Sequence, residues 1–341
     1  MPQKRIVYLF GAGATIAEAA HAGIEQKLSL REISEKVVQK AKRKRGLEDL
    51  LSGISEENIN DIELYISLLE SLGIKKYSSA ATELRDMFCK CIQQALIQGG
   101  KLIEPVLAMA LLEMHSAAKI QAIEQLKGII TLNYDNLLDR AFNTILGGVN
   151  YGIACNCVSG NYNIKQNGPL LIKLHGSFNW RTGFPIRLVD GKKTRSGEQE
   201  EMIWIPPGIQ KENDRYPFNL LWGKAFELLD CDTLRIVGCS LSQNDWGLMS
   251  LLFFSQIRSR PKLEYQIEII NRHQNGIETR EKNGFLRHLK VLGELDGCQD
   301  FVDVDPPNVF ETWLTTRLNL YLRKGIPVGE LQLKYVNQLM R

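Results

Sequence analysis

Short apolar runs that stop abruptly at glycine or at a polar residue constrain the fold of this chain more than any other feature. Residues 6–10 (IVYLF) are mostly β-branched or aromatic and are followed at once by glycine. Comparable runs occupy residues 128–132, 170–174, 202–205, 234–237 and 266–270. Such runs are typical of strands covered on both faces, as in a parallel sheet. We therefore predict an α/β fold, a Rossmann-like parallel sheet with helices on both faces and a ligand crevice at the carboxyl ends of the strands.

A long helical stretch separates the first two runs. Residues 26–125 have helical periodicity almost throughout, with helices expected over 55–72, 78–97 and 105–125. We interpret this stretch as an all-helical insertion into an α/β core made of residues 1–25 and 126–305. Residues 306–341 are again helical in pattern, and we expect a C-terminal helical segment there.

Charge and cysteine content limit the classes of protein to which this chain can belong. The chain has 42 Lys and Arg against 39 Asp and Glu, a net charge of +3, so nucleic acid is not implied by charge. The basic run at 40–45 (KAKRKR) is typical of a solvated helix end, although it leaves a local nucleic-acid patch open as a trigger. The odd count of seven cysteines indicates a reducing compartment. No run approaches the roughly 18 apolar residues of a membrane-spanning helix, and we expect a cytoplasmic protein with no membrane contact.

The first motif that indicates a ligand site is GAGAT at residues 11–15, between a strand and an alanine-rich helix. Glycines at such a turn let the backbone approach a phosphate at the helix N-terminus, but tight packing of the turn explains them equally well. The dehydrogenase fingerprint G-x-G-x-x-G fails at Ile16, and no P-loop sequence is present. A hydride-transfer enzyme and a P-loop ATPase are therefore disfavoured.

Two further motifs place polar side chains at strand ends. In TLNYD (131–135), Asn133 can both donate to and accept from a ribose hydroxyl or a water, although the motif also fits a cap for the following helix. In KLHGS (173–177), His175 can deprotonate a water or a ribose hydroxyl, although a lone histidine is more often structural.

The last two motifs follow the strands expected at 234–237 and 266–270. Gly238 and Ser240 in VGCSLSQND (237–245) can contact a phosphate or a ribose. Asp245 has near capping-box spacing from Ser242, so we expect it to be structural. Asn271 in INR (270–272) can meet a second ribose.

In this order the five motifs resemble the sirtuin family, and the resemblance implies an NAD-binding fold with ten site residues. Two would be catalytic: Asn133, which would hold the nicotinamide ribose or the attacking water, and His175, which would be the general base. The others would bind NAD along its phosphates, riboses and adenine: Gly11, Ala12, Gly13, Thr15, Asp135, Gly238, Ser240 and Asn271.

The chain also departs from the protein-deacylating sirtuins. Those proteins carry a zinc module of two Cys-x-x-Cys pairs after the catalytic histidine, and no such pair follows His175 here. Cys89 and Cys91 would point about 200° apart on a helix, so they are poorly placed to share the four-ligand site that zinc prefers. We expect no metal. The stretch after GAGAT also lacks the G-I-P-D-F-R-like segment of deacylases.

What remains resembles the sirtuin-like NAD hydrolases of bacterial anti-phage defence. The resemblance implies cleavage of NAD+ to ADP-ribose and nicotinamide, assembly into a homo-oligomer, and activation by that assembly or by a partner such as a hexameric ATPase translocase. Two alternatives stay open. One is an NAD-dependent protein deacylase, and the other is a non-catalytic sensor module that binds NAD or ADP-ribose.

Overall fold

A six-stranded parallel sheet forms the centre of the protein. The structure is a computed structural model that describes residues 3–24, 28–51, 62–71, 73–158, 161–189, 202–205, 215–241, 245–259, 265–272, 290–292, 308–327 and 333–340. The strands are β1 (Lys4–Phe10), β4 (Glu124–Thr131), β6 (Leu170–Lys173), β10 (Thr233–Val237), β11 (Gln266–Ile270) and β12 (Lys290–Leu292). They lie in the order β12-β11-β10-β1-β4-β6, and each pairs with its neighbours in parallel. Counted along the chain within this sheet, the order is 3-2-1-4-5-6 from the β6 edge, the Rossmann arrangement, with its switch point between β1 and β10.

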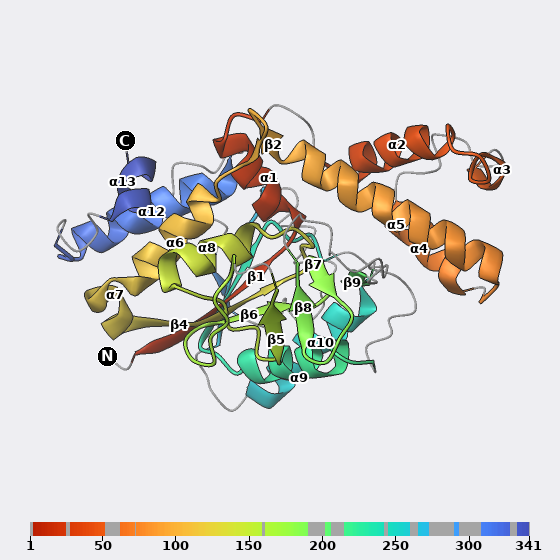
Figure 1. Cartoon of the computed structure of the whole chain (residues 1–341). Helices are drawn as coiled ribbons and strands as arrows, with labels where there is room; N and C mark the ends of the chain where they lie inside the picture. The colour runs from red at the N-terminus through yellow and green to blue at the C-terminus, as the bar shows by residue number, and fades with distance from the viewer. Residues whose placement is uncertain are drawn as a thin grey trace.

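Helices cover both faces of this sheet, which confirms the predicted fold class (Figure 1). One face carries α1 (Ala12–His21), α6 (Val106–Ser116), α8 (Leu137–Leu146) and α12 (Val309–Arg323). The other carries α9 (Phe218–Leu228) and α10 (Trp246–Ser259). The C-terminal segment is helical as expected, with α13 (Lys334–Leu339) packed against α6. Within the described ranges, no helix is both long and apolar enough to cross a membrane.

One expected strand of the parallel sheet belongs elsewhere. The apolar run at 202–205 gives β9 (Met202–Trp204), which pairs antiparallel with β7 (Gly176–Arg181) in a second, four-stranded sheet. That sheet has the order β5-β8-β7-β9 and also contains β5 (Cys155–Cys157) and β8 (Ile186–Leu188). The expectation was wrong because a three-residue apolar strand has the same composition in either kind of sheet.

The helical stretch between β1 and β4 divides between two hydrophobic cores. One core lies among four helices: α2 (Leu30–Ala41), α3 (Glu48–Leu51), α4 (Ile62–Ser71) and α5 (Lys75–Ala95). We call the three longer ones, α2, α4 and α5, the helical module. Helix α6 instead contributes to the main core beneath the sheet. The border between the two cores therefore falls after α5 and before α6. The predicted domain boundary at residue 125 stays a prediction.

One helix of that stretch differs from the sequence expectation. The helix expected over 105–125 breaks at Ala117, whose backbone is extended, into α6 and the short α7 (Ala118–Ile123). After α5 ends at Ala95, Gly99 and Gly100 form the turn of a hairpin between β2 (Ile97–Gln98) and β3 (Lys101–Leu102). The basic run at 40–45 is mostly exposed at the end of α2, and Lys44 pairs with Glu83 at 2.8 Å.

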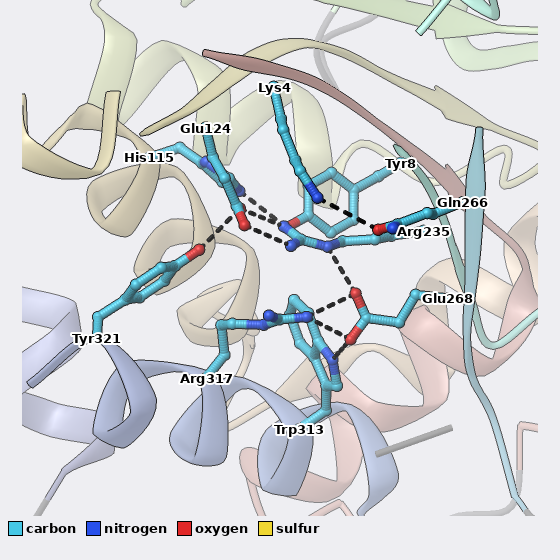
Figure 2. A network of polar contacts seen from close by, with 10 residues as sticks. All are labelled: Lys4, Tyr8, His115, Glu124, Arg235, Gln266, Glu268, Trp313, Arg317 and Tyr321. Atoms are coloured by element: carbon cyan, nitrogen blue, oxygen red, sulfur yellow. Dashed lines mark hydrogen bonds and ion pairs between the residues drawn. The ribbon is translucent and has the colours of Figure 1, made fainter. Parts of the chain in front are cut away.

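A row of charged and aromatic residues fastens α12 to the sheet (Figure 2). Tyr8, Arg235 and Glu268 are direct neighbours in register across β1, β10 and β11. The Arg235 guanidinium, 2% exposed, donates to Glu268 at 2.8 Å and to the Tyr8 hydroxyl at 2.8 Å. It also pairs with Glu124 at the start of β4 at 2.9 Å. These contacts place one guanidinium between two carboxylates on the face of the sheet that α12 covers, and Arg317 of α12 supplies the second positive charge.

Helix α12 completes this network from one of its faces. Trp313, Arg317 and Tyr321 are spaced four residues apart and therefore point to the same side of the helix. The Trp313 indole and the Arg317 guanidinium donate to Glu268 at 2.6 and 2.5 Å. The Tyr321 hydroxyl donates to Glu124 at 2.7 Å. His115 contacts the Tyr8 hydroxyl at 2.8 Å, and burial followed by the charge of Arg235 lowers its pKa to about 3, so its imidazole is neutral.

A buried carboxyl on α1 caps α6. Helix α6 follows Pro105 and has no side-chain cap of its own. Glu18 supplies one, because its two carboxyl oxygens accept from the Leu107 and Ala108 amides at 3.0 and 2.6 Å. These bonds favour the carboxylate, but burial outweighs them and raises the pKa of Glu18 to about 8.

Glu18 should make the stability of the protein depend on pH near neutrality. Because its folded-state pKa lies above the unfolded value, Glu18 stabilises the fold fully below about pH 4.5, and that contribution is lost as the pH rises through about 8. Relative to a Glu18→Gln variant, the wild type should therefore lose about 1–3 kcal/mol of unfolding free energy between about pH 5 and 8. Urea denaturation of both proteins across this range measures the difference, and parallel stability curves would contradict the assignment.

Candidate functional site

A cavity of about 240 Å³ opens at the carboxyl edge of the sheet. One wall consists of the loops that follow β1, β4, β6 and β10, so the cavity lies at the switch point where a Rossmann-order sheet binds its ligands. The opposite wall is mainly apolar and comes from the helical module, with Ile33, Phe88 and Ile92 among its residues. The predicted crevice is therefore present, and the helical module closes one side of it.

All ten predicted site residues except Gly13 and Asn271 line this cavity. The Gly13 amide donates to the Gly238 carbonyl at 2.9 Å, and a Cβ on Gly13 would lie 2.6 Å from the Gly238 Cα. Gly238 has φ +58°, and a Cβ there would lie 2.4 Å from the Ala14 nitrogen. Close packing of the turns after β1 and β10 thus requires these glycines, whatever they bind. Asn271 does not line the cavity, but it donates to the Cys239 carbonyl at 3.3 Å and so stabilises the loop after β10.

Asn133 is held by a chain of hydrogen bonds that joins the loops after β1 and β4. Its Nδ2 donates to the Gly11 carbonyl and to Thr15 Oγ1, both at 2.9 Å. Thr15 in turn donates to Asp135 Oδ2 at 2.6 Å. Because both protein acceptors take the Nδ2 side of the amide, Oδ1 is the atom of Asn133 that can accept from a ligand. Asp135 Oδ1 accepts from the Leu137 amide at 3.0 Å, so the helix-cap interpretation of this motif holds for Asp135.

His175 lies in the turn between β6 and β7, next to a carboxylate that the sequence analysis assigned a structural role. His175 and Asp245 are 2% and 3% exposed, and His175 Nε2 lies 3.4 Å from Asp245 Oδ2. Asp245 Oδ1 accepts from the Leu248 amide at 3.0 Å, so Asp245 caps α10 and has the expected structural role, while its predicted capping-box partner Ser242 lies outside the described residues. Asp245 therefore has two roles, and the second was missed. A carboxylate at this position orients the imidazole and stabilises its protonated form.

Lys173 is a second supporting residue that the sequence analysis missed. It is fully buried, and its Nζ donates to the Asp135 carbonyl at 2.5 Å and to Asp139 at 2.8 Å. Tyr151 donates to the same Asp139 carboxylate. The lysine of the KLHGS motif thus ties the turn that carries His175 to the loop that carries Asn133. The sequence did contain a signal for this role, because a lysine stands at the end of an otherwise apolar, buried strand.

Among the residues that the structure describes, no group of three or more His, Cys, Asp or Glu side chains is placed to hold a metal ion. Cys89 and Cys91 are both buried on α5, while Cys155 and Cys157 lie on β5. Cys298 is outside the described residues.

Comparisons with known proteins find a family model that matches part of the chain, and solved structures with some similarity. Residues 127–283 match the family model described as the SIR2-like domain. Among solved structures, a Sir2 homologue in complex with NAD matches with a TM-score of 0.41 and 16% identity, covering 84% of this chain and 90% of that one. A variant of a Sir2 homologue in complex with ADP-ribose matches with a TM-score of 0.40 and 16% identity, covering 84% of this chain and 92% of that one. No curated protein matches the sequence.

Proposed function

We propose that this chain is an NAD+ glycohydrolase that cleaves NAD+ to ADP-ribose and nicotinamide. One observation carries the proposal: His175 and Asn133 meet the glycine-containing loops after β1 and β10 at a single cavity, at the switch point of a sheet with Rossmann order. The match of residues 127–283 to the SIR2-like domain supports NAD as the substrate.

The residues around the cavity suit a dinucleotide. Helix α1 begins at Ala12, which lines the cavity, so the positive end of the helix dipole faces the space where a diphosphate would lie. Gly11, Gly238 and Ser240 also line the cavity, and because they carry small side chains or none, they leave the backbone there open to a ligand. Asn133 and His175 supply polar groups for the ribose that carries nicotinamide.

The proposed reaction breaks the bond between nicotinamide and C1′ of its ribose. Nicotinamide leaves with the bonding electron pair and becomes neutral, while positive charge develops on the ribose, as in other glycosidic cleavages. A water molecule then forms the new bond to C1′, with Asn133 Oδ1 accepting from it and His175 taking its proton. Asp245 stabilises the resulting imidazolium. The balance is NAD+ and water giving ADP-ribose, nicotinamide and one proton.

Incubation of the purified chain with NAD+, followed by chromatography of nicotinamide and ADP-ribose, tests this proposal. Nicotinamide released without any acyl-lysine peptide supports hydrolysis. Release only when such a peptide is supplied supports the deacylase alternative. NAD+ that binds and is recovered intact under every condition supports the sensor alternative.

We further propose that the protein is a cytoplasmic anti-phage effector that depletes NAD+ once it is activated. A resting form of low activity would protect the host, so we expect control by homo-oligomer assembly or by a partner such as a hexameric ATPase translocase. Light scattering coupled to gel filtration, with activity measured in each fraction, tests the link. A fully active monomer at every concentration would refute control by assembly.

Replacing Asp245 by asparagine should separate its two roles. Asparagine is as good a helix cap as aspartate, so unfolding free energy should change by less than about 1 kcal/mol. The loss of the negative charge beside His175 should lower kcat by about 10- to 100-fold, because the imidazolium is no longer stabilised. Steady-state kinetics and chemical denaturation measure the two effects. An Asp245→Asn variant with wild-type kcat would contradict the pairing.

A further inference from the structure

A second cavity lies on α8, apart from the candidate functional site. Its volume is about 210 Å³, and it is lined by Arg140, Asn143 and Thr144 of α8 and by Asn161 and Tyr162 of the segment before β6. None of these residues lines the first cavity. All five carry a polar group, one is positively charged and none is acidic. The lining therefore favours a polar ligand that carries negative charge.

The positive charge in this lining has no counter-charge in the described part of the chain. Arg140 is partly buried, and its Nη1 donates to the Ile103 carbonyl at 2.7 Å. No described carboxylate pairs with its guanidinium. Glu104, which follows Ile103, accepts instead from the Tyr335 hydroxyl at 2.6 Å. An anion from solution would supply the missing charge.

Other arginines that are at least partly buried show the partner that such a guanidinium usually has. Four of them pair with a carboxylate at 2.5–3.1 Å: Arg5, Arg85, Arg235 and Arg317. Loss of water around an unpaired guanidinium is costly, and arginine is seldom buried unless it is paired. Arg140 departs from this pattern at a place where the surface is hollow, which indicates a ligand site.

Arg140 and Thr144 supply hydrogen-bond donors on one face of α8. They are four residues apart, so their side chains are neighbours on the helix surface. Within the described ranges, Nε and Nη2 of Arg140 have no hydrogen-bond partner, and neither has Oγ1 of Thr144. The Nε and Nη2 donors lie side by side in the guanidinium plane and match two oxygens of one phosphate or carboxylate. The threonine hydroxyl can donate to a further oxygen.

The opposite wall of the cavity is fastened to α8. Asn143 Nδ2 donates to the Asn161 carbonyl at 3.3 Å, and its Oδ1 accepts from the Asn163 amide at 2.9 Å. Tyr162 is 5% exposed, and its hydroxyl accepts from Asn136 Nδ2 at 3.1 Å. The cavity is therefore formed before any ligand binds, which reduces the entropy lost on binding.

We propose that this cavity is a second ligand site, which binds a phosphate group through Arg140 and Thr144. A phosphate has three or more acceptor oxygens, so it can satisfy the guanidinium and the hydroxyl together, whereas both oxygens of a carboxylate are used by the guanidinium. One water fits in about 10–15 Å³ of such volume, so the cavity has room for a sugar attached to the phosphate. The inference does not rest on NAD+ cleavage, because the two cavities share no residue.

Nuclear magnetic resonance of the full-length, arginine-labelled protein tests the site directly. The Nε–H signal of Arg140 is identified by its absence in Arg140→Gln, and inorganic phosphate and ribose 5-phosphate are titrated separately. The signal should shift and saturate with a Kd below about 10 mM for at least one probe. A Kd at least about threefold lower for ribose 5-phosphate identifies a sugar phosphate as the ligand, and equal values identify free phosphate. No saturable shift with either probe would overturn the proposal.

Three variants separate this site from general attraction of anions. Arg140→Gln should lower the affinity for the better probe about tenfold or more in calorimetry, because it removes hydrogen bonds to a charged ligand. Thr144→Val, at an exposed position, should raise the Kd from the Arg140 signal about two- to fivefold. Arg31→Gln is the matched control. It also removes one positive charge, from a surface arginine that pairs with Glu35 at 3.1 Å, and should leave the Kd unchanged.

Thermal unfolding checks that each variant is folded. If Arg140→Gln does not fold, the decision rests on Thr144→Val, whose side chain has no partner to lose within the described residues. An unchanged Kd in Thr144→Val, unchanged binding in a folded Arg140→Gln, or an equal loss in Arg31→Gln would each refute the site.

Discussion

Replacing His175 by alanine is expected to lower kcat for NAD+ cleavage by about 10²–10⁴-fold, the range that general-base catalysis contributes. Among the described residues that line the cavity, His175 is the only histidine, and it has a carboxylate partner, Asp245 at 3.4 Å. Without it, water must attack the developing cation unaided. The assay is nicotinamide release under saturating NAD+, with equilibrium binding of ADP-ribose measured in parallel.

Binding of ADP-ribose should survive the substitution, since the loops after β1 and β10 are untouched. Asn133→Ala should also lose activity, and it should weaken the contact between the loops after β1 and β4 because Nδ2 donates to Gly11 and Thr15. His21→Ala is a suitable control, because His21 pairs with Glu311 at the far end of α1 and does not line the cavity. Full activity in His175→Ala or in Asn133→Ala would show that the site is wrongly assigned.

Replacing Glu268 by alanine is expected to lower the free energy of unfolding by about 3–5 kcal/mol, the cost of leaving buried charges without their partner. Its carboxylate accepts from Arg235, Arg317 and Trp313, and all three donors would remain inside the protein. Burial opposes ionisation of Glu268, but Arg235 and Arg317 outweigh it and lower the pKa of this carboxyl. The stabilisation is therefore present at neutral pH and is lost only as the pH falls below the usual range of a glutamate.

Urea denaturation at neutral pH measures this effect. Glu227→Gln is the control, because Glu227 pairs with Lys224 at 2.9 Å on the exposed surface and should contribute less than about 0.5 kcal/mol. A quadruple variant that replaces Glu268, Arg235 and Arg317 by leucine or methionine and Glu124, the other partner of Arg235, by glutamine should be more stable than Glu268→Ala, because no buried charge is left unpaired. A loss below about 1 kcal/mol in Glu268→Ala would show that water or relaxation compensates the two guanidinium groups.

The sequence predicted the sheet and the position of the cavity well, because both follow from local patterns. Strand-end motifs such as TLNYD and KLHGS place Asn133 and His175 at the carboxyl edge whatever the rest of the chain does. The second sheet was missed because β5 and β8 have three residues each and are stabilised by partners distant in sequence. Such strands carry too few residues for a period to be recognised.

The supporting groups of the site were harder to predict, since their roles depend on distant contacts. Asp245 is seventy positions from His175 and also caps a helix, which is a sufficient local explanation for an aspartate there. Glu63, which lines the cavity, has the ordinary appearance of an acid in a first helical turn. Arg235 and Glu268 gave a usable signal that was overlooked: each interrupts an apolar strand at a matching position, and the two strands are neighbours.

The placement of the helical module has a consequence for the order of folding. The contacts among α2, α4 and α5 join residues that are closer in sequence than β1 and β4 are, so closing their loops costs less entropy. The pairing of β1 with β4, in contrast, must bring together strands that the whole module separates. A module that condenses early would act as a compact spacer and shorten the effective distance between these strands. In native-state hydrogen exchange, the amides of α5 and those of β1 should then open as two distinct cooperative groups.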